Sequence, residues 1–209
     1  MLRTNLPEGF PNLDVCKGHW SNFGKAVNAG IQAVRDIDGL AGRPTKIILH
    51  VADPKNLDHW TRDIMAKGSV SDFDIMGVSY YHIWHSTISF DALPDLLKSL
   101  RQTHQKDFMV LETAYPFTSA NNDSYNNIYF DQEPVKDFDY TVEGQKQFMT
   151  ALNQNMQEAG VLGVIYWEPA WISSTMNDGW GTGSSWENVA FFDFQGRATS
   201  VLDYLSHPY

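Results

Sequence analysis

One carboxylate directly follows a short, wholly apolar segment of the chain. Residues 108–111 read Phe-Met-Val-Leu, Glu112 comes next, and the chain turns soon after at Tyr115 and Pro116. A continuous apolar run of this length is typical of a strand buried on both faces, and proline cannot continue a strand's hydrogen-bonded ladder. Because α/β folds carry their chemistry at the carboxyl ends of such strands, Glu112 is a candidate catalytic carboxylate. The alternative is a glutamate that only reaches solvent at the end of a strand.

Polar and aromatic side chains also lie near the ends of other predicted strands. Apolar segments predict these strands at residues 46–51, 73–81 and 163–167. The first carries His50 near its end, the second Tyr81, and the third Trp167. Side chains alternate between the two faces of a strand, so Ser79 and Tyr81 are expected on one face. A tyrosine hydroxyl there can donate to a nearby carboxylate, and a tyrosine of the core is the alternative.

Helical spacing of apolar residues separates these strands. It predicts helices at residues 20–36, 57–67, 90–104 and 142–159, and a short last helix at 198–205. Strands that alternate with helices form a parallel sheet with right-handed crossovers. We therefore expect one α/β domain over residues 1–209, with a functional loop at 117–139 because a plain connection is rarely so long.

Composition excludes several classes of function. The chain has 209 residues, of which 43% are hydrophobic, and a formal net charge of -10, so it can build a core but offers no basic patch for nucleic acid. No apolar run reaches the roughly 18 residues of a membrane span, and no apolar signal core opens the sequence. The single cysteine, Cys16, rules out an internal disulfide. Four of the seven tryptophans lie between Trp167 and Trp186, which favours carbohydrate binding, with core packing as the alternative.

Four motifs carry a resemblance to a known family. They are residues 73–85, residues 112–116 (Glu-Thr-Ala-Tyr-Pro), residues 166–171 (Tyr-Trp-Glu-Pro-Ala-Trp) and residues 179–188. Together with the helix over 28–36, they resemble the arabinogalactan endo-β-1,4-galactanases of glycoside hydrolase family 53, over roughly residues 20–203. The resemblance implies a (β/α)8 TIM barrel, of which only the C-terminal half, strands five to eight with their helices, is present.

The resemblance also implies a reaction, the retaining hydrolysis of the β-1,4-galactan side chains of pectin. In this family the nucleophile is a glutamate on the seventh strand, which Glu112 matches, and Tyr81 would orient it. The family's acid/base glutamate stands in a Gly-Asn-Glu motif that this sequence lacks, so we expect a truncated chain without that residue. The alternatives are a non-catalytic galactan-binding half-barrel, or a related glycosidase that acts on β-mannan or β-glucan.

Five side chains are expected to bind the sugar: His50, Trp84, His85, Trp167 and Trp171. His50 and Trp167 take this role from the resemblance. Trp84 and His85 follow Tyr81 in the next loop. Trp171 shares a loop with Trp180 and Trp186, whose rings are either walls of sugar subsites or anchors of the loop. Strand alternation points Glu168 away from Trp167, so one of the two faces the sugar and the other faces the helices. The resemblance implies that Trp167 faces the sugar and that Glu168 is structural.

One loop has the composition of a calcium site. Asp123, Tyr125 and Asn127 offer carboxylate, backbone carbonyl and amide oxygens at alternate positions, which suits a hard cation. The resemblance supports structural calcium here, because some members of the family hold the ion in this loop. An Asn/Asp-rich turn is the alternative. No cofactor is required for the reaction.

The expected partners are β-1,4-galactan or galacto-oligosaccharides, with no nucleic acid and no membrane. A half-barrel leaves strand edges and apolar side chains uncovered, so we also expect self-association or pairing with the missing half. The side chains expected on the uncovered face are Leu49, Gly77, Leu111 and Ile165. Members of the family are typically secreted or periplasmic, although this chain shows no signal peptide.

Overall fold

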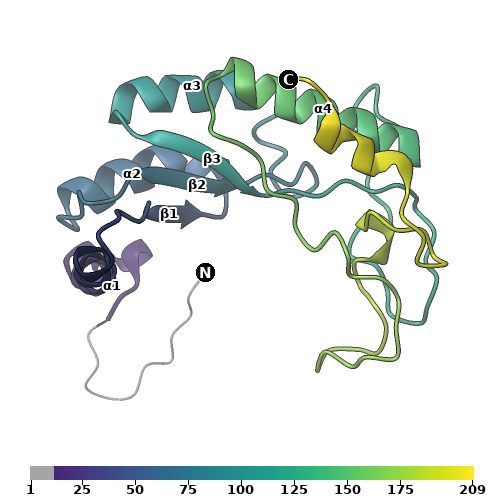
Figure 1. The fold of residues 1–209 in the computed structure, drawn as a ribbon, viewed down its shortest axis with the longest axis horizontal. Coiled ribbons are helices and arrows are strands. Elements are labelled where there is room, and N and C mark those ends of the chain that lie inside the picture. The colour runs from purple at the N-terminus through teal and green to yellow at the C-terminus, as the bar shows by residue number, and fades with distance from the viewer. Residues whose placement is uncertain (1–11) are drawn as a thin grey trace.

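A three-stranded parallel sheet lies at the centre of the computed structural model, which describes residues 12–209 (Figure 1). Its strands are β1 (Ile48–Val51), β2 (Ile75–Ser79) and β3 (Asp107–Glu112), in the order β1-β2-β3. The α-helices are α1 (Trp20–Ala41), α2 (Leu57–Ala66), α3 (Leu93–His104) and α4 (Val142–Glu158). The 3-10 helices are η1 (Val15–Lys17), η2 (Pro54–Asn56), η3 (Glu187–Val189) and η4 (Ser200–Ser206). The predicted alternation of strands and helices, and the parallel sheet, are confirmed.

The helix α1 continues past its predicted end at residue 36. Gly39 lies within the helix, and the helix ends only at Gly42, which has φ = 68° and donates its backbone N–H to the Asp38 carbonyl. This left-handed conformation is what closes a helix, and glycine adopts it without a steric cost. A glycine in an exposed helix weakens it but does not have to end it.

The predicted fourth strand, residues 163–167, is reduced to one isolated parallel bridge between Val110 and Val164. The segment still lies along β3, since Val110 donates its N–H to Gly163 at 3.0 Å and accepts from Ile165 at 2.8 Å. The ladder then loses its register, because the next bond joins the Trp167 N–H to the Thr113 carbonyl. A regular strand needs successive pairs in one register, so the prediction of a full strand is wrong although the segment's position beside β3 is right.

The two faces of the sheet differ in burial. Side chains on one face are fully buried beneath the helices; they are Met76, Val78, Phe108 and Val110. On the opposite, open face, Ile48 is 37% exposed and Ile165 is 45% exposed. Leu49 pairs with Met76 across the ladder, so both side chains lie on the covered face. The prediction that Leu49 lies on the uncovered face is therefore wrong. Ile48 takes that place instead, beside Gly77 and Leu111.

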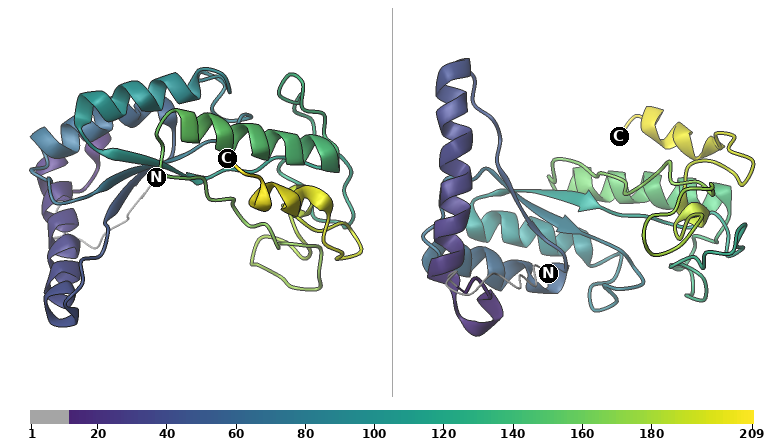
Figure 2. Two further views of the ribbon diagram at one scale, coloured as in Figure 1. Left: turned by 45° about the horizontal axis from the view of Figure 1, so that its top comes forward. Right: turned by 90° about the horizontal axis from the view of Figure 1, so that it is seen from below.

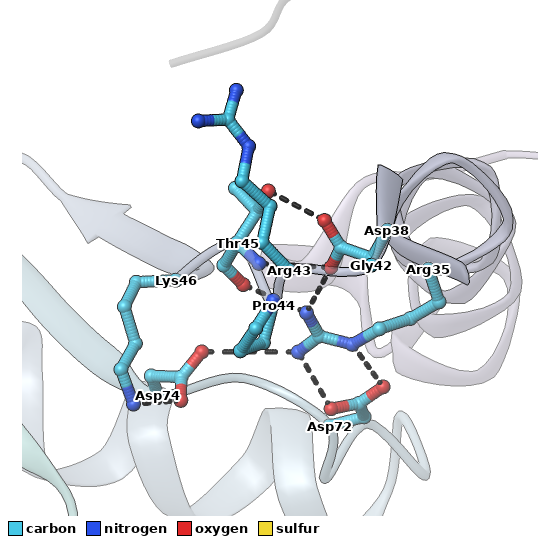
Figure 3. A pocket seen from close by; sticks show the side chains of 9 residues that line it. All are labelled: Arg35, Asp38, Gly42, Arg43, Pro44, Thr45, Lys46, Asp72 and Asp74. Carbon is cyan, nitrogen blue, oxygen red and sulfur yellow. Dashed lines mark hydrogen bonds and ion pairs between the residues drawn. The ribbon is translucent and has the colours of Figure 1, made fainter. Parts of the chain in front are cut away.

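A network of ion pairs attaches α1 to the amino-terminal end of the sheet (Figure 3). Arg35 donates to both carboxylate oxygens of Asp72, at 2.8 and 2.9 Å, and also to Asp38. Lys46 pairs with Asp74 at 2.8 Å. The hydrogen bonds from Arg35 hold the pKa of Asp72 below its ordinary value. Both views in Figure 2 show α1 at one side of the sheet and the C-terminal segments at the other, so this network lies far from the loops after α4. Its charges satisfy one another, which fits a structural role.

None of the helices within residues 12–209 is both long enough and apolar enough to cross a lipid bilayer. The single domain over residues 1–209 stays a prediction, and residues 1–11 lie outside the described part of the chain.

A half-buried histidine lies where the loop after β2 meets the long loop after β3. The ring of His82 lies among those of Tyr115, Tyr129 and Phe148, and its Nε2 is 2.9 Å from the Tyr140 hydroxyl. Its Nδ1 is buried without a hydrogen-bond partner. Burial lowers the pKa of His82 to about 4, from an ordinary value of 6.5.

We expect His82 to make the fold sensitive to acid. In the unfolded chain the imidazole of His82 binds a proton near pH 6.5, whereas in the folded chain it binds one only near pH 4. The free energy of unfolding therefore falls as the pH drops from 6.5 to about 4. The full effect is about 3 kcal/mol, at 1.36 kcal/mol for each pH unit. Urea unfolding at pH 7 and pH 4.5 should show a smaller loss for His82→Asn than for the parent. The exposed His59→Asn is the control and should keep the parent's pH dependence; equal losses in all three proteins would contradict the assignment.

Candidate active site

Glu112, Tyr81 and His50 meet at the carboxyl ends of three neighbouring strands. The Tyr81 hydroxyl donates to Glu112 Oε2 at 3.2 Å. His50 Nδ1 lies 3.9 Å from Glu112 Oε1, while His50 Nε2 is 2.9 Å from the Ser79 hydroxyl. The structure therefore brings together three side chains that the sequence singled out, and it confirms that Ser79 and Tyr81 share a face. The catalytic role of each stays a prediction.

The surroundings of Tyr81 favour its role as a hydrogen-bond donor. Burial, followed by the negative charge of Glu112, raises the pKa of the Tyr81 phenol well above its ordinary value. The phenol therefore keeps its proton at neutral pH, and the carboxylate of Glu112 is the acceptor. Aromatic contacts hold the ring, since Trp84 packs edge-on against it at 4.9 Å and Trp186 at 6.0 Å between ring centres.

An aromatic cavity of about 490 Å³ opens beside Glu112. Its lining includes Tyr81, Trp84, Tyr125, Trp167, Trp171, Asp178, Trp180 and Trp186. This volume falls within the range of about 300–1,000 Å³ that is usual for ligand sites. Flat aromatic surfaces around a carboxylate suit a sugar, whose C–H faces are apolar and whose hydroxyls are polar. Of the five predicted sugar-binding side chains, Trp84, Trp167 and Trp171 line the cavity.

The structure separates the tryptophans that the sequence left undivided. Trp186 is buried, and its indole N–H donates to the Trp167 carbonyl at 3.1 Å, so it anchors the loop. Trp180 is 90% exposed at the tip of a turn closed by a bridge between Asn177 and Thr182. Trp171 is half-buried. Only the tertiary contacts could assign these positions, because the three residues share one Gly/Ser-rich loop.

His85 lies elsewhere than predicted. It is buried and absent from the cavity lining, and its Nδ1 accepts the backbone N–H of Tyr81 at 3.0 Å. Burial lowers the pKa of His85, which favours the neutral ring that this bond needs. His85 therefore supports the backbone of Tyr81, and it does not contact the cavity.

Glu168 also departs from its expected position. It is exposed rather than packed against the helices, and its φ of 51° is left-handed. Alternation holds only in extended backbone, so the argument that pointed Glu168 to the helices does not apply at this residue. Trp167 does face the cavity, as expected.

Sequence reasoning missed Asp178, the second carboxylate in the cavity lining. It accepts the backbone N–H groups of Trp180 and Gly181 at 2.8 and 2.9 Å, and these bonds lower its pKa. A carboxylate held ionised in this way is a poor general acid. Its signal in the sequence was an Asp-Gly pair in a loop, which is common in any turn.

The predicted calcium loop is folded around Asp123. One oxygen of this carboxylate accepts from Ser173 and Ser184, and the other from the Tyr125 backbone N–H. Asn127 Oδ1 and Glu187 Oε2 are both buried without a hydrogen-bond partner, and burial raises the pKa of Glu187. Within residues 12–209 no three His, Cys, Asp or Glu side chains form a metal-binding group. Glu187 is a residue that the sequence analysis missed, and the calcium site stays a prediction.

Comparison with known proteins decides the family. The model of glycosyl hydrolase family 53 matches residues 6–205. This chain belongs to glycosyl hydrolase family 53. It is 39% identical to the arabinogalactan endo-beta-1,4-galactanase of Cellvibrio japonicus over 200 residues. This alignment covers 96% of this chain and 51% of that relative.

Two solved structures of family 53 relatives support the fold class. The catalytic domain from Ignisphaera aggregans is 32% identical, with a TM-score of 0.79 over 90% of this chain and 52% of that one. A fungal beta-1,4-galactanase is 28% identical, with a TM-score of 0.70 over 90% of this chain and 55% of that one. The predicted class, a (β/α)8 TIM barrel of which the described strands form part, is confirmed. The family 53 chain spans about half the length of the curated relatives it matches.

Proposed function

We propose that this chain carries the nucleophile side of a retaining endo-β-1,4-galactanase that cleaves the galactan side chains of pectin. One observation carries the proposal: Glu112 lies at the edge of a tryptophan-lined cavity and accepts a hydrogen bond from Tyr81. Membership of family 53, and a relative named arabinogalactan endo-beta-1,4-galactanase, support the choice of substrate.

In the proposed reaction, Glu112 attacks the anomeric carbon and forms a covalent glycosyl-enzyme. The leaving oxygen takes a proton from a second carboxylic acid, which then activates water to release the sugar with retained configuration. Tyr81 holds the attacking carboxylate in place by its hydrogen bond. Trp167 offers a flat surface for the sugar, and His50 is close enough to Glu112 to contact the same ring.

The second carboxylic acid is the component that the cavity lining does not supply. Retention requires two carboxyl groups about 5–5.5 Å apart. The sequence has no Gly-Asn-Glu motif, and Asp178, the other carboxylate of the cavity lining, is held ionised. We propose that the acid/base glutamate comes from polypeptide beyond these 209 residues, either in the same protein or in a partner that completes the barrel.

Release of reducing ends from β-1,4-galactan tests the function, measured for the chain mixed with the part of a family 53 relative that it does not match, with β-mannan and β-glucan as parallel substrates and Glu112→Gln as the blank. Cleavage of galactan above the blank supports the proposal. Cleavage of mannan or glucan alone would assign the chain to a different specificity. Binding of galacto-oligosaccharides without any cleavage would favour the second candidate, a galactan-binding protein, which the exposed tryptophans and the unassigned acid/base support.

Trp167→Ala should weaken the binding of galacto-oligosaccharides at least about tenfold, because the lost apolar contact is of the order of 1–2 kcal/mol. Trp167 lines the cavity and is 42% exposed, so its ring is open to a ligand. Titration calorimetry measures the change. Phe130→Ala is the matched control, since Phe130 is an exposed aromatic residue outside the cavity lining. Unchanged affinity in a folded Trp167→Ala protein would remove this residue from the sugar site.

We also propose a structural calcium ion in the loop of Asp123, Tyr125 and Asn127, with Glu187 as a further ligand. The unpartnered oxygens of Asn127 and Glu187 support it, since calcium binds through carboxylate, amide and carbonyl oxygens. Calcium at a hundred times its Kd should stabilise the fold by about 2.7 kcal/mol relative to a chelator, measured as a higher Tm. Magnesium should do less, and Glu187→Gln should lose most of the gain. Equal Tm values with calcium and with chelator would favour a protonated Glu187 instead.

A further inference from the structure

The side chains of β3 stop alternating at its carboxyl end. Phe108 and Val110 are fully buried on the covered face. Met109 and Leu111 occupy the open face, where Leu111 lies against Gly77 of β2. Regular alternation would send Glu112 to the covered face. Glu112 is instead beside Tyr81 and lines the cavity, so two consecutive residues of β3 face the same way.

Both neighbours of β3 record the same interruption. On one side Val78 pairs with Val110 but Ser79 pairs with Glu112, so one residue of β3 is skipped. On the other side the Val110 carbonyl accepts from Ile165, whereas the next bond, from Trp167, reaches past residue 112 to the Thr113 carbonyl. The residue skipped in the ladder with β2 is Leu111, which makes it a β-bulge, and the bonds to the segment on the other side also leave one extra residue between Val110 and Thr113. Bulges are rare between parallel strands, and those at barrel rims re-aim a side chain.

Gly77 provides the space into which the bulge fits. A Cβ on Gly77 would lie 2.2 Å from Leu111 Cδ1 and 2.7 Å from its Cγ, distances that atoms do not tolerate. It would also lie 3.2 Å from Ile48 Cγ2, so the Leu111 side chain fills the notch above the glycine on the open face. Gly163, on the other side of β3, differs: its Cβ would meet only Met109 Cε, at an ordinary 3.6 Å.

We propose that Gly77 and Leu111 form a positioning pair that aims the carboxylate of Glu112 at Tyr81. The missing side chain at residue 77 lets Leu111 lie on the open face, and the resulting bulge turns the next residue to that face as well. Neither residue is expected to touch the substrate. The catalytic meaning of the pair rests on the proposed function, whereas the aim of Glu112 is a property of the fold and is tested separately.

The first test measures the hydrogen bond between Tyr81 and Glu112 without any substrate. Tyr81→Phe and Glu112→Ala are made singly and together, and the shifts in their urea midpoints are compared. In the parent the two shifts should be non-additive, because both changes remove one bond. In the Gly77→Ala protein the two shifts should become additive, because the hydrogen bond is already lost. In the Gly77→Ala, Leu111→Ala protein the shifts should again be non-additive. The same non-additivity in the Gly77→Ala protein would overturn the proposal.

A second series covers the case in which Gly77→Ala does not fold. Leu111→Val in the Gly77→Ala background keeps a smaller side chain at the notch. The non-additivity of Tyr81→Phe and Glu112→Ala in this protein should lie between that of Gly77→Ala alone and that of Gly77→Ala with Leu111→Ala. Gly163→Ala is the matched control, a glycine beside β3 with room for a methyl group, and it should leave the coupling unchanged. Loss of the coupling in the control would show that any added methyl group disturbs the sheet, which would also overturn the proposal.

The second test uses hydrolysis of β-1,4-galactan. Gly77→Ala should lower kcat at least about tenfold with little change in KM, because a misplaced nucleophile affects the reacting geometry more than substrate binding. The double change Gly77→Ala, Leu111→Ala should recover to within about threefold of Leu111→Ala alone. A folded Gly77→Ala protein with the parent's kcat would contradict the pair's role in catalysis. These rates are measured with the complementary half-barrel added wherever the chain needs it for activity. If the parent cleaves no galactan even in that mixture, the proposed function fails, and the urea experiment still decides the positioning.

Discussion

Glu112→Gln should lower kcat/KM for galactan by at least about a thousandfold, since a covalent nucleophile is lost. Glutamine matches glutamate in shape and can still accept the Tyr81 hydrogen bond, so the fold and the cavity should persist. It cannot attack the anomeric carbon as a carboxylate does. Reducing-end release from galactan, measured beside the thermal stability of both proteins, gives the result.

A matched control separates the loss of the nucleophile from the loss of one negative charge. Glu158→Gln makes the same change at an exposed position near the end of α4 and should leave kcat/KM within about twofold of the parent, as surface changes usually do. If the chain needs added polypeptide for activity, the comparison is made in that mixture. Activity of Glu112→Gln within tenfold of the parent would remove Glu112 from the nucleophile's role.

We expect the 209-residue chain on its own to self-associate. Within the described residues β1 pairs only with β2 and leaves its other edge open. Ile48 and Ile165 are exposed on the open face of the sheet, and Ile37 and Leu40 are 63% and 85% exposed on α1. Open strand edges and grouped apolar side chains favour association. Light scattering after size-exclusion chromatography should show oligomers whose share grows with protein concentration.

A complementary half-barrel should reverse this association and raise hydrolysis by several powers of ten. The added polypeptide is the part of a family 53 relative that this chain does not match, about 150 residues for half or more of a typical barrel. It would pair with the open edge of β1, cover the open face and bring a second carboxylic acid to Glu112. The same segment with its acid/base glutamate changed to glutamine should restore the compact species but not the activity. A monomer that cleaves galactan unaided would contradict this expectation and would require a second carboxylic acid within the chain.

Hydrophobic periodicity determined the main features of the fold. The order of the elements, the parallel sheet and the position of Glu112 at the carboxyl end of β3 all follow from it. Alternation from Ser79 correctly grouped it with Tyr81, although β2 itself ends at Ser79. The family motifs predicted which strand ends carry chemistry, and three of those side chains lie together in the structure.

Only the tertiary structure decided where several side chains point. Alternation from Val110 directs Glu112 to the covered face, and the bulge at Leu111 turns it to the open one. The bulge depends on Gly77, which belongs to another strand, so the sequence around Glu112 does not contain the information. Glu168 fails for a related reason, since its left-handed backbone ends the alternation. His85 contacts the backbone of Tyr81 rather than the cavity. Periodicity describes a regular strand or helix, whereas bulges, left-handed residues and buried hydrogen bonds are fixed by contacts between segments distant in sequence.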